Sequence, residues 1–309
     1  MSVINSSSFA KALWPGVNAW YGKAYSEYPV EYTKLFETYK SSKQFEEDVG
    51  VSSFGLGIVK GEGAPIQYDS ERQSFITRYN HVVYALGFII TREIMDDDQY
   101  DVVGQRKAQG LAFSMRQTKE IVAANVYNRA FSTNQLGGDG SSLIAAGYPG
   151  GSTNHPNFAG GSQTNGPSVA SDLSEAALEQ AHIDIAGFTN DRGLLISVRP
   201  KTLVIPRQLM FEAKRIVSPD GRPGADTNDI NALKLMGLVP ETVVNHYLVD
   251  QDAWFLRTDV PHGMKYWERR ADSFDMDNDF DTENAKFKAT GRYAFGFTDP
   301  RGMYASPGA

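Results

Sequence analysis

The sequence predicts an α+β protein, and three observations lead to that fold class. Residues 51–92 are typical of a long β-hairpin, one long amphipathic helix follows them, and the second half mixes short helices with short strands. The chain has 29 glycines and 14 prolines among 309 residues, which favours strands and loops over a helical bundle. We find no internal repeat, and the length allows one large domain or two of medium size.

The composition excludes several classes of protein. There is no cysteine, which rules out disulfides, thiolate nucleophiles and cysteine-ligated metal sites. The net charge is −7, and we interpret the most basic stretch, Val102–Phe131, as solvated positions along a helix, so no sequence-specific contact with DNA is expected. The longest apolar run, Val82–Ile90, is too short to span a membrane, and Met1–Ser8 lacks a signal-peptide pattern. We therefore expect a soluble, intracellular protein without a membrane partner.

Residues 1–50 are rich in large aromatic side chains but lack a long apolar period. The pattern predicts an irregular arm that packs on something else, because such side chains would be a liability if they were exposed. Within this arm, Lys34–Phe45 is predicted to form a short helix.

The next segment is predicted to be a long hairpin. An alternating apolar pattern covers Phe54–Val59, turn-forming residues cover Gly61–Asp69, and a β-prone run covers Ser74–Thr91. A lone projecting hairpin is marginal in water, so neighbouring copies of the chain are its natural support. The candidate residues for contacts with other subunits are Phe54, Leu56, Ile58, Lys60, Pro65, Ile66 and Tyr68.

A long helix is predicted after the hairpin. The run Asp96–Asp98 is typical of a helix N-terminus, and a metal cluster is the weaker alternative because consecutive helical residues point in different directions. A helix of about 30 residues spans ~45 Å, which together with the hairpin predicts an elongated subunit. The face predicted to meet a sheet holds Ala108, Leu111, Met115, Val122 and Val126, whereas Arg106, Gln117 and Asn128 are predicted to point away.

The second half begins with a glycine-rich loop over residues 132–172 and continues with alternating elements. Helices are predicted over Leu173–Gly187 and Gln208–Val217, with an exposed loop over Asp220–Asp229. Strands are predicted over Ile196–Ile205, Val239–Leu248, Ala253–Arg257, Met264–Arg269 and Ala285–Thr298, with an acidic stretch over Glu268–Glu283.

Motifs for chemistry are absent from the sequence. There is no Gly-x-Ser-x-Gly motif, and a phosphate loop near Gly22-Lys23 fails on its spacing and lacks the following Ser or Thr. The five histidines are isolated and are interpreted as surface or structural residues. The segment Asp275–Asp281 resembles a calcium loop, but Phe280 and Lys286 stand where Gly and Glu are needed. We therefore expect no catalytic residue, no cofactor and no metal, and the protein is predicted not to be an enzyme.

The ordered set of features resembles the major capsid proteins of tailed bacteriophages, which share the Hong Kong 97-type fold. The resemblance rests on an aromatic arm, a hairpin containing Gly61–Pro65, a single long helix and a glycine-rich passage into a second unit. Later segments that carry it are Arg199–Pro206, Asp252–Asp259, Phe287–Tyr293 and Asp299–Tyr304. It covers nearly the whole chain.

The resemblance implies a division of the chain. Residues 1–50 would form an N-terminal arm, residues 51–92 an extended E-loop, residues 93–135 and 259–297 a peripheral domain with its spine helix, and residues 136–258 and 298–309 an axial domain. It also implies hexamers and pentamers that close into an icosahedral shell around double-stranded DNA, which is held without sequence preference. Scaffold, portal and decoration proteins would be further partners, and the shell would assemble in the cytoplasm of a host bacterium to become the virion capsid.

Two alternatives stay open at this point. The same fold builds bacterial encapsulin compartments, which hold cargo enzymes rather than a genome, although the long arm and the glycine-rich E-loop favour the viral interpretation. Some family members join an E-loop lysine covalently to a distant asparagine. Lys60 lies in the hairpin, but no pattern identifies its acceptor.

Overall fold

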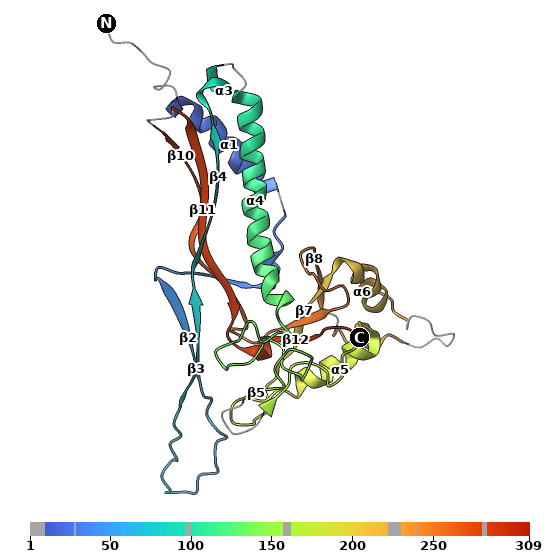
Figure 1. The fold of residues 1–309 in the computed structure, drawn as a ribbon. Coiled ribbons are helices and arrows are strands. Elements are labelled where there is room, and N and C mark those ends of the chain that lie inside the picture. Colours follow the sequence, from blue (N-terminus) through green and yellow to red (C-terminus); the bar gives the residue numbers. More distant parts are fainter. Residues whose placement is uncertain are drawn as a thin grey trace.

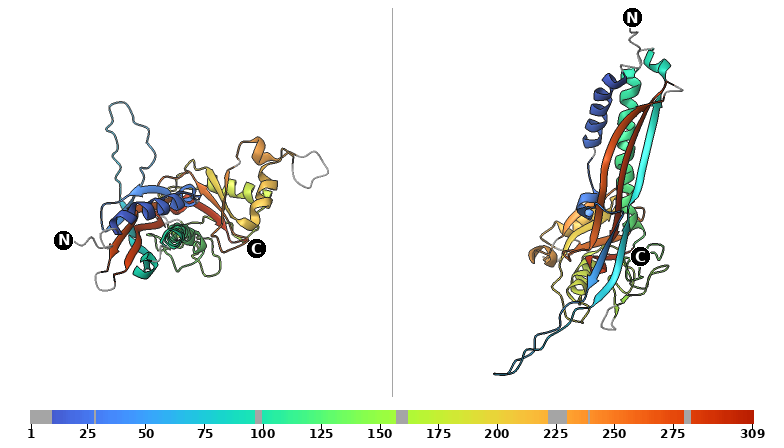
Figure 2. Two further views of the ribbon diagram at one scale, coloured as in Figure 1. Left: turned by 90° about the horizontal axis from the view of Figure 1, so that it is seen from above. Right: turned by 90° about the vertical axis from the view of Figure 1, so that its left-hand side faces the viewer.

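The computed structural model describes residues 10–27, 29–96, 100–156, 162–221, 230–238, 240–279 and 283–309. The molecule is elongated: a tall layer of sheet and helix stands on one side, a second lobe extends sideways from its lower half, and a hairpin projects below both (Figures 1 and 2). The expected elongated shape is therefore confirmed.

The N-terminal segment differs from its prediction. Residues Ala10–Glu27 form the helix α1, which packs along α4, rather than an irregular arm. Val17, Tyr21 and Ala24 are spaced by four and three residues, so they lie on one face of α1 and are buried in the same subunit. The aromatic residues of the following turn, such as Phe36, are buried locally as well. Much of the apolar surface of this segment, which the sequence predicts to pack on something else, is thus covered within the same chain.

The predicted helix over Lys34–Phe45 is wrong. A single helical turn, α2 (Tyr32–Leu35), is followed by two strands, β1 (Glu37–Lys40) and β2 (Phe45–Val51). The reason is a long-range pairing: β1 runs parallel to β10, with Glu37 opposite Lys265. Backbone hydrogen bonds to a distant strand outweigh the weak local preference for helix.

The tall layer is built on a four-stranded sheet of order β1-β10-β11-β4. Strand β4 (Val82–Ile90) matches the apolar run, and β11 (Ala285–Phe297) lies antiparallel between β4 and β10. Strand β10 (Met264–Asn278) extends beyond the predicted Met264–Arg269 and includes much of the acidic stretch. Its register shifts between Glu268 and Ser273, where a bulge turns Asp272 toward the interior.

Helix α4 (Tyr100–Asn128) crosses this sheet, preceded by α3 (Arg92–Asp96). The predicted sheet-facing residues are confirmed: Val122 is partly buried, and the other four are buried. Arg106 is exposed as predicted, but Asn128 is not turned away, since its amide group bonds the backbone of Tyr247 and Val249 at 3.2 and 3.0 Å. Asp97 and Asp98, the proposed start of the helix, lie outside the described residues.

The buried sector of α4 is wider than one apolar stripe because α1 covers a second side of it. Arg116 and Lys119 were predicted to be solvated, yet both are buried, as is Glu120. The Glu120 carboxylate accepts the backbone N–H groups of Glu31 and Tyr32, each at 3.0 Å. Burial raises the pKa of Glu120, and these two hydrogen bonds counteract that effect. The carboxylate thereby caps the start of α2.

The second lobe contains another four-stranded sheet, of order β12-β9-β7-β8. Its strands are β7 (Pro200–Pro206), β8 (Glu241–Asn245), β9 (Trp254–Thr258) and β12 (Met303–Ser306). The accompanying helices are α5 (Glu175–Ala186), η2 (Arg207–Leu209), α6 (Met210–Val217), α7 (Ala232–Leu235) and η3 (Pro300–Gly302). Most predicted elements are present, although β7 begins four residues later than expected.

Two features of the second lobe follow directly from local chemistry. Ser174 caps α5 by accepting the N–H of Ala177 at 3.1 Å. In its described residues the glycine-rich loop holds one short strand pair, β5 (His155–Pro156) and β6 (Ser162–Gln163), in agreement with its prediction as a loop-rich segment. Residues 222–229 of the predicted exposed loop lie outside the description. No helix among the described residues is long and apolar enough to cross a membrane.

Candidate assembly interface

The projecting hairpin is rooted in a two-stranded sheet. Strand β2 (Phe45–Val51) pairs antiparallel with β3 (Gln73–Asn80), from Phe45 opposite Asn80 to Val51 opposite Gln73. Beyond these strands, residues 52–72, which we call the hairpin loop, extend away from the body (Figure 1). The strand predicted over Phe54–Val59 is therefore wrong. Gly55 and Gly57 weaken that segment, and no ladder partner lies across from it.

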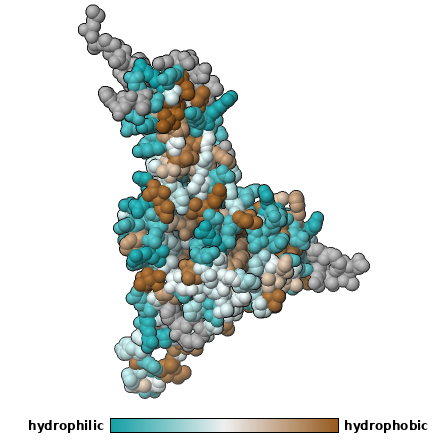
Figure 3. All heavy atoms as spheres, in the orientation of Figure 1, coloured by the Kyte–Doolittle hydropathy of each residue, from teal (hydrophilic) through white to brown (hydrophobic). Residues whose placement is uncertain are grey.

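All seven predicted contact residues lie on the hairpin loop and are exposed. Leu56 is 77% exposed and Tyr68 is 85% exposed, fractions far above those of side chains that pack in a core. The structure spreads them along the loop rather than bringing them together in a pocket. Figure 3 shows hydrophobic residues at the lower, projecting end of the molecule. The loop therefore presents apolar side chains that its own chain does not cover.

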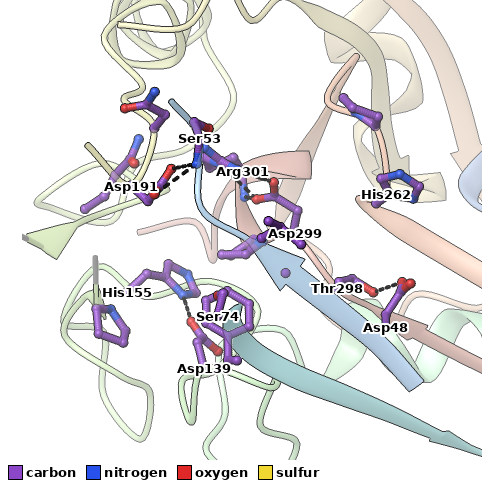
Figure 4. A pocket seen from close by; sticks show the side chains of 18 of the residues that line it. Asp48, Ser53, Ser74, Asp139, His155, Asp191, His262, Thr298, Asp299 and Arg301 are labelled. Carbon is purple, nitrogen blue, oxygen red and sulfur yellow. Dashed lines mark hydrogen bonds and ion pairs between the residues drawn. The ribbon is translucent and has the colours of Figure 1, made fainter. Parts of the chain in front are cut away.

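Polar contacts hold the base of the hairpin loop against the second lobe. The backbone N–H of Ser53 donates to both carboxylate oxygens of Asp191, at 3.0 and 3.1 Å (Figure 4). The Arg192 guanidinium donates to the carbonyl oxygens of Ser53 and Ser70 at 3.1 and 2.9 Å. Arg192 also pairs with Asp69 at 3.3 Å. Asp191 and Arg192 thus join the two ends of the loop to the turn after α5.

Asp69 holds the loop together from within. Its carboxylate accepts the N–H of Gly55 at 2.8 Å across the hairpin, and the N–H of Ser70 at 2.8 Å. The hydrogen bond from Gly55 and then that from Ser70 lower the pKa of Asp69, because both favour the ionised carboxylate. Asp69 therefore anchors the loop in its ionised form.

The root of the hairpin is tied to the tall sheet through Asp48 on β2. Asp48 forms an ion pair with the buried Lys265 of β10 and accepts the Thr298 hydroxyl at 2.6 Å. Thr298 in turn shares a hydrogen bond of 2.6 Å with the Tyr79 hydroxyl on β3. Burial alone would raise the pKa of Asp48, but Lys265 and Thr298 outweigh that effect and lower it. Both strands of the root are thereby fixed to the body.

A cavity of about 430 Å³ lies between the hairpin root, the glycine-rich loop and the second lobe (Figure 4). Its polar lining includes Asp48, Ser74, Asp139, His155, Asp191, His262, Asp299 and Arg301. Within the described part of the chain, no group of three or more histidine and acidic side chains could hold a metal ion. In the calcium-loop-like segment, Asp275 and Asp277 are exposed on β10, whereas Phe280 and Asp281 lie outside the described residues.

The sequence did not identify the anchoring residues. Asp191 and Arg192 belong to a turn that contains Gly193 with a positive φ of 79°. The glycine indicates a turn, but it does not indicate that the turn contacts the hairpin loop. Asp48 and Thr298 are 250 positions apart. Only the tertiary structure brings each pair of residues together.

The arrangement of these parts defines the class of the protein. A tall sheet crossed by one long helix, a second lobe with its own sheet and a projecting hairpin constitute the Hong Kong 97-type fold of capsid proteins. Residues 76–306 match the model of the family described as phage capsid protein. The chain belongs to this family, and its class is that of the major capsid protein, a structural protein of the viral capsid.

Solved structures share the fold at low sequence identity. The virus-like particle protein from Pyrococcus furiosus is 9% identical, with a TM-score of 0.53 over 94% of this chain and 98% of that chain. The capsid protein of a native GTA particle is 12% identical, with a TM-score of 0.54 over 89% and 88%. The mature capsid protein of bacteriophage PhiM1 is 13% identical, with a TM-score of 0.51 over 90% and 86%. No curated protein matches the chain.

Proposed function

We propose that this protein is the repeated subunit of an icosahedral phage head, in which hexamers and pentamers close into a shell around double-stranded DNA. One observation carries the proposal: the hairpin loop is anchored at its base by Asp191 and Arg192, yet presents exposed apolar side chains along its length. An apolar projection anchored at its base is a liability on a monomer and a connector in an assembly.

The proposed contacts between subunits are the seven hairpin-loop residues named from the sequence. At about 25 cal/mol per Å², burial of 1,000 Å² of apolar surface per subunit would contribute a gross ~25 kcal/mol before the ordering costs of association. The neighbouring subunit supplies the surface that covers Leu56, Ile66 and Tyr68. The fold's likeness to capsid proteins supports this role.

We propose the following division of labour within the chain. Residues 1–50 are the N-terminal arm, residues 51–92 the E-loop, residues 93–135 and 259–297 the peripheral domain, and residues 136–258 and 298–309 the axial domain. The two separate sheets support a division into two domains. DNA is held without sequence preference. The net charge of −7 fits this role, because a strongly basic inner wall would trap the packaged DNA. Scaffold, portal and decoration proteins are the proposed further partners, and the virion, assembled in the cytoplasm of a bacterial host, is the proposed location.

Expression of the full chain, followed by negative-stain microscopy and sedimentation velocity, tests the proposal. Closed shells of uniform size, built from this chain alone or with its scaffold, are the expected result. Packaged DNA in particles isolated from infected cells would distinguish a phage head from an enzyme-holding compartment of the encapsulin type. A chain that stays monomeric under all conditions, with and without scaffold, would overturn the proposed assembly.

A further inference from the structure

A buried polar cluster lies on the wall of the cavity beside the hairpin root. It consists of Asp139 in the glycine-rich loop and His155 on β5, both labelled in Figure 4, together with Asn165 just after β6. The side chains of His155 and Asp139 are only 7% and 2% exposed. No function assigned above uses this cluster, and its hydrogen bonds determine its protonation.

The orientation of the Asn165 side chain is fixed by its neighbours. Its amide nitrogen lies 2.7, 3.0 and 3.1 Å from the carbonyl oxygens of Leu143, Pro300 and Met303. Only an N–H group can face three acceptors, so the amide oxygen must point the other way. That oxygen accepts the N–H of Ala145 at 2.8 Å and lies 3.2 Å from Nε2 of His155. His155 must therefore carry a proton on Nε2.

The other ring nitrogen of His155 also faces an acceptor. Nδ1 lies 2.6 Å from a carboxylate oxygen of Asp139. A neutral imidazole has one N–H, and Nε2 already uses it, so a second proton must lie between Nδ1 and the carboxylate. Imidazole binds a proton far more tightly than a carboxylate does, so this proton belongs to the ring. We propose that His155 is held as an imidazolium between Asp139 and Asn165, and that this charged clasp positions the hairpin root.

The link from the clasp to the hairpin is a close backbone contact. Gly138, next to Asp139, packs directly on β3, and a Cβ at this position would lie 2.8 Å from the carbonyl group of Ile76 and would collide with Thr77. Asp139 itself is oriented by the N–H of Ser141, which donates to its second oxygen at 3.2 Å. The clasp thus holds the loop over 137–156 against the strand from which the hairpin loop extends.

The other acidic groups around the cavity are engaged with partners of their own. The other charged and titratable groups there are Asp48 on β2, Asp191 after α5, His262 between β9 and β10, and Asp299 and Arg301 before β12. Each of the acidic groups already has a partner: Asp48 pairs with Lys265, Asp191 accepts from Ser53, and Asp299 binds Arg301 at 2.6 Å. Loss of one ring proton therefore leaves one ring nitrogen of His155 with its lone pair facing an acceptor.

The clasp ties the closure of the loop to the charge on His155. The closed arrangement needs the protonated ring because both ring nitrogens face acceptors. Removal of the ring would release the loop over 137–156 from β3 and loosen the root. The consequence for shell formation rests on the proposed function, whereas the protonation of His155 and the closure of the loop do not.

Nuclear magnetic resonance of ¹⁵N-histidine-labelled protein tests the protonation, with the His155 signals assigned through His155→Gln. We expect both ring nitrogens of His155 to carry protons while the loop is closed, and one of them to lose its proton in Asp139→Asn. A single-protonated ring in the closed state would overturn the proposal.

Asp139→Asn provides the matched variant for the loop. The Asn side chain has nearly the same shape and can donate to a neutral Nδ1, so the contact survives without the extra proton. Hydrogen exchange of residues 137–156 should stay as slow in Asp139→Asn as in the wild type and should accelerate in His155→Ala. The control His246→Gln should behave as the wild type. Unchanged exchange in His155→Ala would contradict the clasp.

Shell stability separates this inference from the proposed function. In sedimentation velocity, His155→Ala shells should be less stable than wild-type and Asp139→Asn shells. Shells of identical stability would overturn the link between the clasp and the hairpin while leaving the assembly proposal intact. Failure of the wild type to form shells at any pH would instead refute the assembly proposal.

Discussion

Lys119 on α4 and Asp272 on β10 form an ion pair of 2.8 Å in the interior of the protein, with only 3% of each side chain exposed. The Tyr25 hydroxyl on α1 donates to the same carboxylate oxygen. The ammonium group of Lys119 also lies 5.0 Å from the centre of the Tyr293 ring, a favourable cation–π distance. The pair therefore joins α1, α4 and the tall sheet at one point.

Removal of one partner of this ion pair should destabilise the subunit strongly. Lys119→Met leaves the Asp272 carboxylate buried without its cation, which typically costs about 3–5 kcal/mol. Urea unfolding of the free subunit, followed by circular dichroism, measures the loss. Lys107→Met, at an exposed position on the same helix, is the control and should change stability little. Equal effects of the two substitutions would show that the buried pair does not hold these elements together.

Two glycines should respond to alanine in opposite directions. Gly110 lies in α4 with no atom within 4 Å of an added Cβ, so Gly110→Ala should stabilise the free subunit by about 0.5–1 kcal/mol through helix propensity. Gly291 lies against Asp272, and a Cβ there would collide with its carboxylate, so Gly291→Ala should destabilise. Denaturant midpoints of both variants test this. A stabilised Gly291→Ala protein would contradict the observed packing of Asp272.

Met115 is a strict test of the face that α4 presents to the sheet. Its side chain is 2% exposed and belongs to a core cluster with Ala112 and Phe274. Met115→Asp would place an unpaired charge in this apolar contact and should cost several kcal/mol, so little soluble protein is expected. Gln117→Asp, at a half-buried position, is the matched control. Soluble, assembly-competent Met115→Asp protein would show that the contact is dispensable.

Deletion of Gly61–Ser70 should separate assembly from folding. The segment runs from the exposed end of the hairpin loop to Asp69 and Ser70 at its base, and the two main sheets and α4 do not include it. We expect circular dichroism to report a folded chain and sedimentation velocity to report no stable shells, because the same contact is lost at every interface. Shells of normal size would show that the loop is not a connector between subunits. A chain that fails to fold would place the hairpin in the core.

Acid should loosen the hairpin loop through Asp69. Its pKa is lowered from 3.8 by the N–H groups of Gly55 and Ser70, so the ionised carboxylate is preferred in the folded state. The stabilisation is present above the ordinary value and disappears as pH falls through the lowered one. Pepsin cleavage within residues 52–72 of the wild type should therefore accelerate as pH falls through the lowered pKa of Asp69. The rate is compared with that of Asp69→Ala at the same pH. Asp69→Ala should be cut readily throughout. Parallel pH profiles for the two proteins would argue against this anchor.

Local patterns were sufficient to predict the elements that depend on residues close to one another in the sequence. The apolar run of β4, the sheet-facing residues of α4 and the capped helix α5 were all predicted, because their periodicity or cap lies within a short window. The exposed hairpin loop was predicted as well, but its strands were displaced: β2 lies before the alternating segment, where pairing with β3 is available.

By itself, the sequence determined the fold class, the order of the long elements and the loop that carries uncovered apolar side chains. The tertiary structure decided which side chains anchor that loop and which charges are buried: Arg192 meets Ser70, Lys119 meets Asp272, and His155 meets Asn165 and Asp139. The physical reason is the range of the interactions. Hydrophobic periodicity is read along one element, whereas a hydrogen bond or an ion pair needs two groups within about 3 Å, which for distant residues only the folded backbone supplies.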